Sequence, residues 1–128
     1  MIKTYQDLRV WQEAYTVSVD IYRLTKNFPP YETYGLASQI QRAAVSVPSN
    51  IAEGYRRMHP KEYAHFLRIS LGSLAELETQ LRMAKDFGYL AEAEYLLLER
   101  RMDYVGRMLM KLLMAVLQSK NPVFNPPI

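Results

Sequence analysis

Apolar residues recur in steps of three and four along most of the chain, which is the spacing of one face of an α-helix. The most regular series lies in the C-terminal third and consists of Tyr95, Leu98, Met102, Val105, Leu109, Leu112 and Val116. Similar series occupy three earlier segments, and prolines or glycines separate one segment from the next. The alternating pattern typical of β-strands is missing from the sequence. The sequence therefore predicts an all-α protein, an up-down-up-down four-helix bundle.

Stop signals divide the chain into predicted helices that span residues 6–26, 32–55, 60–87 and 91 to the tail. Pro29 ends the first helix because proline cannot supply a backbone donor. Pro60 suits the first turn of the third helix, and Gly88 suits its end. Residues 1–118 form the predicted bundle domain. Residues 119–128 contain three prolines and are predicted to be an extended Pro-rich tail.

Pro48 lies inside the apolar series of the second predicted helix. A proline there removes one backbone donor and crowds the carbonyl four residues earlier, which predicts a kink near Pro48. Ser46, Ser49 and Asn50 flank the proline, and their side chains can satisfy the freed backbone groups. Gly54 is a candidate for the end of this helix.

Polar residues form a second stripe on each of the two central helices. Their spacing predicts a structural polar network made of Gln39, Asn50, Glu53, Glu76 and Gln80. Ser46 and Ser73 lie on the same two stripes. An alternative is that Glu53 and Glu76 form a carboxylate pair for acid-base chemistry, but stripes on adjacent helices favour the network. Gly72 and Ser73 are weak helix formers in the middle of the third predicted helix, and together they indicate the close approach of a neighbouring backbone.

The sequence offers no set of residues for catalysis or metal binding. Cysteine is absent, which excludes disulfides and thiolate metal sites. Glu62 and His65 have the Glu-x-x-His spacing of di-iron bundles, but they form a single pair. Neither a serine elbow nor a phosphate-binding glycine loop is present. The sequence therefore predicts a non-enzymatic protein with no metal or cofactor. Without a signal peptide or an apolar run of ~20 residues, it is predicted to be cytoplasmic, with no membrane contact.

Basic residues gather around the turn between the second and third helices, in a chain whose net charge is +3. The residues predicted to contact nucleic-acid phosphates are Arg56, Arg57, Lys61 and Arg68, together with Arg42 earlier in the second helix. Tyr55 and Tyr63 lie among them, and an exposed tyrosine can stack on an unpaired base. The alternative is that these tyrosines belong to the core and the arginines to an ordinary solvated surface.

The helices carry more apolar surface than one bundle interior requires. Trp11, Tyr15 and Tyr22 form a second stripe on the first helix, which indicates two neighbouring helices or a subunit contact. Trp11 itself is interpreted as a core residue. Leu96 and Leu97 lie off the seam of the fourth helix. This surplus predicts a homo-oligomer. It also supports an alternative function, a protein-protein interaction scaffold that does not bind nucleic acid directly.

Three blocks of the sequence carry a family resemblance: DLRVWQEAYTVSVDIYRLTKNFP, YGLASQIQRAAVSVPSNIAEGYRR and EYAHFLRISLGSLAELETQLRMAKDFGYL. Together they resemble the four-helix-bundle family known as 23S rRNA-intervening-sequence proteins, over residues 5–117. The most specific parts are Trp11-Gln12 and residues 39–42, 48–54 and 72–81.

That family is also similar to the accessory variability protein of diversity-generating retroelements, a bundle that forms a pentameric barrel and binds nucleic acid and a reverse transcriptase. The resemblance therefore implies a homopentamer with a role in binding RNA or DNA. It leaves open which nucleic acid is bound, and whether a partner protein such as a reverse transcriptase takes part.

Overall fold

The computed structural model describes residues 2–119 and contains four long helices: α1 (Arg9–Leu24), α2 (Leu36–Arg57), α3 (Pro60–Asp86) and α4 (Glu92–Gln118). Short 3₁₀ turns, η1 (Tyr5–Asp7), η2 (Thr25–Asn27) and η3 (Pro30–Glu32), precede α1 and connect it to α2. Within residues 2–119 there is no strand, so the prediction of an all-α four-helix protein is confirmed. The predicted Pro-rich tail lies, apart from Ser119, outside the described residues. None of the described helices is long and apolar enough to cross a membrane.

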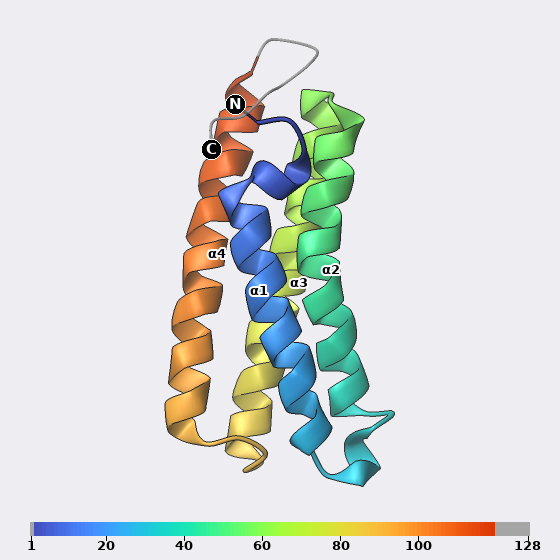
Figure 1. The fold of residues 1–128 in the computed structure, drawn as a ribbon, viewed down its shortest axis with the longest axis vertical. Helices are drawn as coiled ribbons and strands as arrows, with labels where there is room; N and C mark the ends of the chain where they lie inside the picture. Colours follow the sequence, from blue (N-terminus) through green and yellow to red (C-terminus); the bar gives the residue numbers. More distant parts are fainter. Residues whose placement is uncertain (1, 120–128) are drawn as a thin grey trace.

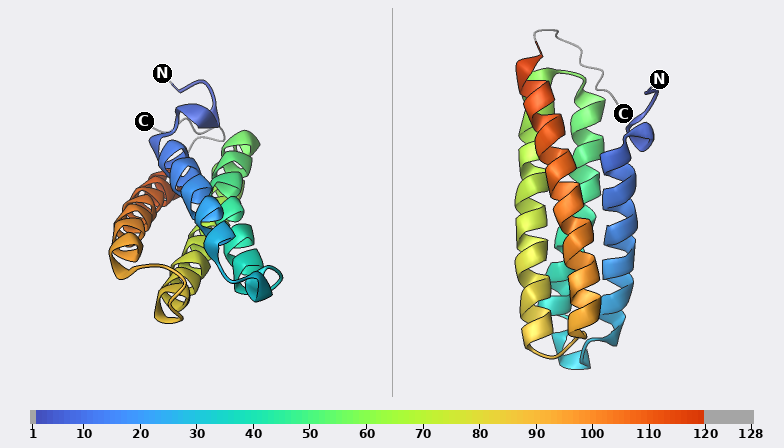
Figure 2. Two further views of the ribbon diagram at one scale, coloured as in Figure 1. Left: turned by 60° about the horizontal axis from the view of Figure 1, so that its bottom comes forward. Right: turned by 90° about the vertical axis from the view of Figure 1, so that its left-hand side faces the viewer.

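Each helix packs against the next one in the chain, and α4 also packs against α1. Figure 1 shows α1 running down the long axis, α2 returning upward, α3 running down and α4 returning upward. The two views in Figure 2 show the four helices from other sides, with their axes inclined to one another in the left-hand view. The α2–α3 turn therefore lies at the end of the bundle where α1 begins and α4 ends.

The helix bounds differ from the predicted ones mainly where short turns tighten the chain. Residues 6–8 belong to a 3₁₀ turn and its cap, so α1 starts at Arg9 rather than near residue 6. The Asp7 carboxylate accepts hydrogen bonds from the backbone N–H groups of Lys3 and Thr4, at 2.8 and 3.1 Å. These bonds stabilise the charged carboxylate, the one from Lys3 most, and lower the pKa of Asp7.

The end of α2 is also later than expected. The helix passes through Gly54 and ends at Arg57, where Met58 adopts a left-handed conformation with φ 57° and closes it. The secondary structure of α2 is continuous through Pro48, and the kink there stays a prediction. Met58, His59 and the first-turn Pro60 then reverse the chain within a very short connection.

Large apolar side chains fill the interior between the four helices. The largest fully buried ones include Tyr63, Ile21, Ile40, Ile51, Leu67, Leu77, Leu81, Met102 and Leu109. Among them, Tyr63 marks a close approach of α2 and α3, because a Cβ atom added to Gly54 would lie 2.9 Å from the Phe66 Cβ and 3.0 Å from Tyr63 Cδ1. Gly72 has no neighbouring atom within 4 Å of such a Cβ, so of the pair Gly72 and Ser73, for which a close approach was predicted, only Ser73 contacts α2.

Short polar side chains join α2 to α3 around Pro48. The Ser46 and Ser73 hydroxyls are hydrogen-bonded at 2.7 Å. The Asn50 amide donates to the Ser46 carbonyl and hydroxyl oxygens, at 2.8 and 2.9 Å. The buried Ser70 hydroxyl donates to the carbonyl of Val47, the residue before Pro48, at 2.7 Å. A polar network between the two helices therefore exists, and serines form most of it.

The residues predicted for this network are placed differently from one another. Asn50 belongs to it, and Gln80 is half-buried with a buried side-chain oxygen. Gln39, Glu53 and Glu76 are exposed, and in the described part of the chain no hydrogen bond joins them across the helix pair. A serine is short enough to bond within a close helix contact, whereas longer side chains on the same stripe extend to solvent.

We expect Asn50→Asp to lower the free energy of unfolding at pH 7 by about 1–3 kcal/mol. The carboxylate would place acceptors against the Ser46 carbonyl oxygen, where the amide now donates. Gln39→Glu is the matched control, since Gln39 is exposed on the same helix. Urea unfolding followed by circular dichroism measures both. Equal unfolding midpoints for the two variants would contradict a stabilising role for the amide.

Candidate nucleic-acid interface

The predicted basic cluster is assembled by the short turn between α2 and α3. Arg56 and Arg57 lie in the last turn of α2, where the carbonyl end of the helix favours positive charge. Lys61 lies in the first turn of α3, and Arg68 lies about two turns further along. All four side chains are exposed. The turn thus brings the four predicted residues to one end of the bundle.

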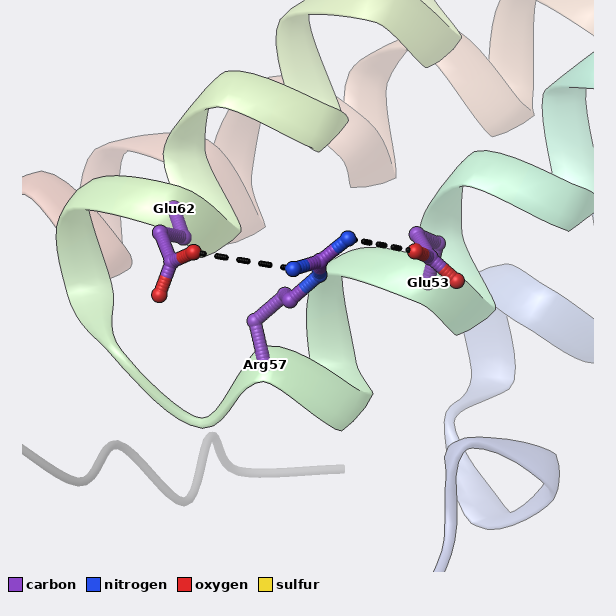
Figure 3. A network of polar contacts seen from close by, with 3 residues as sticks. All are labelled: Glu53, Arg57 and Glu62. Carbon is purple, nitrogen blue, oxygen red and sulfur yellow. Dashed lines mark hydrogen bonds and ion pairs between the residues drawn. The ribbon is translucent and has the colours of Figure 1, made fainter.

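Arg57 is held by two carboxylates. Its guanidinium bonds to a Glu53 carboxylate oxygen at 2.8 Å and lies 3.8 Å from a Glu62 carboxylate oxygen, as Figure 3 shows. It also lies 5.1 Å from the centre of the Phe66 ring. Arg57 therefore connects the end of α2 to the start of α3, with its charge balanced locally. Because these groups are half exposed, the ion pairs are weak and exchangeable.

Arg56 points to another part of the molecule. Its guanidinium lies 5.5 Å from the centre of the Tyr5 ring in η1, a cation–π contact. Among the described residues, no carboxylate lies within ion-pair distance of Arg56, Lys61 or Arg68. These three cations are consequently the members of the cluster that are free to neutralise an external anion.

Arg42 is not part of this cluster. It is exposed on α2, about 21 Å before Arg56 at 1.5 Å per residue. It lines a shallow groove together with Tyr22 of α1 and the polar residues Ser46 and Asn50. The structure therefore separates Arg42 from the other predicted phosphate contacts.

The tyrosines near the turn pack in or against the core. The alternative interpretation, that they are core residues, is therefore correct for Tyr63. Tyr63 is fully buried, and burial raises the pKa of its hydroxyl. Tyr55 is half-buried and meets Tyr63 edge to face, with ring centres 6.2 Å apart. The Tyr63 ring is therefore not accessible for stacking on a base.

Two accessible rings that were not predicted as site residues lie on α1. Tyr15 and Tyr22 are exposed, and half-buried Trp11 stacks on Tyr15 with ring centres 5.0 Å apart. Trp11 does pack against the core, as expected, but it also lines a groove beside α2. The second aromatic stripe of the first helix, Trp11, Tyr15 and Tyr22, indicated this surface in the sequence. The sequence of one helix does not show which neighbouring element its stripe faces.

Glu62 and His65 do not face a common centre. Glu62 is directed to Arg57, and the His65 ring meets Phe66 edge to face, with centres 5.3 Å apart. Residues 2–119 hold no group of three or more potential ligands placed to bind a metal ion.

Comparison with known proteins identifies a family and a similar fold. A protein-family model described as "23S rRNA-intervening sequence protein" matches residues 6–111. A crystal structure from Bacteroides thetaiotaomicron VPI-5482, described as a protein with unknown function from the S23 ribosomal protein family, is similar with a TM-score of 0.76. The similarity covers 82% of this chain and 95% of the other at 20% identity, which shows a shared fold alone. No curated protein matches the chain.

Proposed function

The chain belongs to the 23S rRNA-intervening sequence protein family, and we propose that it is a non-enzymatic, cytoplasmic bundle that binds the backbone of RNA or DNA. The observation that carries the proposal is the group of exposed cations at the α2–α3 turn, Arg56, Lys61 and Arg68. In the described region these side chains have no carboxylate within ion-pair distance. Arg57 is paired with Glu53 and Glu62, and it contacts the nucleic acid only when a phosphate displaces these carboxylates.

Phosphate contacts of this kind release counterions, so binding weakens steeply as salt rises. They fix a nucleic acid in place without reading its sequence. The proposed function is therefore binding with strong salt dependence and little sequence preference.

We further propose that the protein acts as a homo-oligomer, with the pentamer implied by the family resemblance. Large apolar side chains of α4 remain exposed on the single chain, including Leu96, Leu97, Met110, Met114 and Leu117. Such a surplus on one helix is typical of a protein interface. Light scattering at micromolar concentration tests this, and a monomer would reject it.

Fluorescence anisotropy with structured ribosomal RNA and with duplex DNA tests the proposed binding at low and at moderate salt. We expect binding at low salt that weakens as salt increases. Absence of binding at low salt would reject the proposal.

The same exposed α4 side chains favour a second candidate function, a scaffold that recruits a partner protein. A pull-down from native lysate with and without nuclease distinguishes the two functions. Partners that persist after nuclease treatment favour the scaffold, and partners lost with the nucleic acid favour direct binding.

Removing the two carboxylates that hold Arg57 is expected to tighten binding. In the double variant Glu53→Gln and Glu62→Gln, Arg57 gains freedom and two repulsive charges are lost. We expect affinity to rise about threefold to tenfold and the salt slope to steepen by up to about one unit. The matched control is Glu92→Gln with Glu94→Gln, an exposed pair at the other end of the bundle. Equal gains in both variants would show a general charge effect instead.

A further inference from the structure

A groove of about 500 Å³ runs between α1 and α2. Its α1 wall carries the rings of Trp11, Tyr15 and Tyr22. Its α2 wall carries shorter side chains: Val45, Pro48, Ser49 and Ala52. Both sets follow helical spacing, so each is one stripe of its helix. The groove exists because long aromatic side chains face short ones, and its volume is in the range of small-molecule sites.

The aromatic wall of the groove is accessible to solvent. Trp11 and Tyr15 are stacked with an interplanar angle of 26°, and Tyr5 meets Trp11 edge to face with centres 5.3 Å apart. Tyr15 is 51% exposed and Tyr22 is 41% exposed. An exposed π face is a site on which any unpaired base can stack, whatever its sequence.

The charged residues that line the groove are Arg23 and Lys26, and both are cations. At the opposite end, Arg56 lies against Tyr5, which also lines the groove. Beyond Tyr22, the shallower groove that shares Val45 and Ser49 leads to Arg42. Cations thus lie at both ends of the aromatic row, and the charge of the groove suits an anionic ligand.

We propose that this groove binds single-stranded nucleic acid, with bases stacked on Tyr15 and Tyr22 and phosphates paired with Arg23, Lys26 and Arg56. A duplex hides its base faces within its own stack, whereas a single strand presents both flat rings and regularly spaced charges. The groove offers partners for both features along one line. This inference rests on the proposed nucleic-acid binding, and it specifies a strand type and a position on the molecule.

Trp11 is the only tryptophan in the chain, so the intrinsic fluorescence of the full-length protein reports on this groove. We expect titration with oligo(dT) to quench Trp11 fluorescence, and a duplex of the same length to quench it much less. Anisotropy of labelled strands in the same buffer measures binding independently. Binding of oligo(dT) by anisotropy with no change in Trp11 fluorescence would overturn the groove while leaving the proposed function standing. No binding of any nucleic acid at low salt would overturn both.

Tyr15→Ala is expected to weaken oligo(dT) binding roughly 5- to 150-fold, the range measured for loss of one base–aromatic stack. Tyr15→Phe keeps the ring and is expected to restore binding. Tyr34→Ala is the matched control because Tyr34 is 96% exposed and does not line the groove. Circular dichroism establishes that each variant is folded, and Tyr22→Ala replaces Tyr15→Ala if that variant is not. Equal binding by the Tyr15→Ala and Tyr34→Ala proteins would overturn the proposal.

Acrylamide quenching of the free protein tests whether something else covers the groove. We expect Trp11 to be quenched readily, and to the same extent at all protein concentrations. Protection that grows with protein concentration would show that a second copy of the chain occupies the groove, and would overturn the proposal.

Discussion

Gly54→Ala is expected to destabilise the bundle by about 1–3 kcal/mol, although alanine is the better helix former. The new methyl group would lie 2.9 Å from the Phe66 Cβ, 3.0 Å from Tyr63 Cδ1 and 3.2 Å from the Tyr63 carbonyl oxygen. Two of these atoms are Cβ and backbone atoms, which cannot move away without shifting α3. Tyr63 is also fully buried, so the ring has no free space to enter. The helices must therefore separate locally.

Gly72→Ala is the matched control, since this glycine lies in the interior of α3 with nothing within 4 Å of a new Cβ. Replacing it is expected to stabilise the protein by about 0.5–1 kcal/mol through helix propensity alone. Thermal unfolding followed by circular dichroism measures both changes, at roughly 4 °C per kcal/mol. Destabilisation of the same size in both variants would contradict the close contact of α2 and α3 at Gly54.

These two glycines show what local sequence reveals about packing. The sequence assigned a close helix approach to Gly72 and Ser73, because two weak helix formers in the middle of a helix indicate one. Ser73 does bond to Ser46 of α2, whereas Gly72 faces away, and a second close contact lies at Gly54, which local rules interpreted as a helix end. Local spacing does not show which of the two glycines faces a neighbouring helix. That depends on how the partner helix packs.

The four-helix fold itself was predictable because the same apolar spacing is repeated in each of the four helices. Each helix carries its own apolar spacing, and each boundary has its own proline or glycine, so small errors at one end do not change the architecture. Most boundary errors lie at 3₁₀ turns such as Tyr5–Asp7 and Pro30–Glu32, where the residue pattern is compatible with a helix but the hydrogen bonds are shorter in range. The end of α2 was predicted at residue 55 and lies at Arg57.

The candidate site was predictable only in its composition. Arg56 and Arg57 are neighbours in sequence, yet successive helical positions point in different directions, so one meets Tyr5 and the other meets carboxylates. The pairing of Arg57 with Glu62 crosses a turn. The aromatic groove requires two helices at once, since Tyr15 becomes part of a binding surface only where α2 presents short side chains opposite it. Long-range placement of this kind is not encoded in local spacing.

Neutralising the free cations of the turn is expected to have the largest effect on binding. In the triple variant Arg56→Gln, Lys61→Gln and Arg68→Gln, we expect the salt slope to fall by about 2 units for a single strand and nearly 3 for a duplex. At about 0.1 M salt, losing three contacts of this strength corresponds to roughly a hundredfold weaker affinity. Anisotropy across a salt series measures both quantities.

The matched control for this triple variant carries the same change in net charge on another surface: Arg82→Gln, Arg100→Gln and Arg107→Gln, all exposed residues of α3 and α4. A general attraction between a basic protein and a polyanion would respond equally to both triple variants. A localised interface responds to the first alone, because a released counterion requires a phosphate in direct contact. Equal loss of affinity in the two variants would therefore place the binding surface away from the α2–α3 turn.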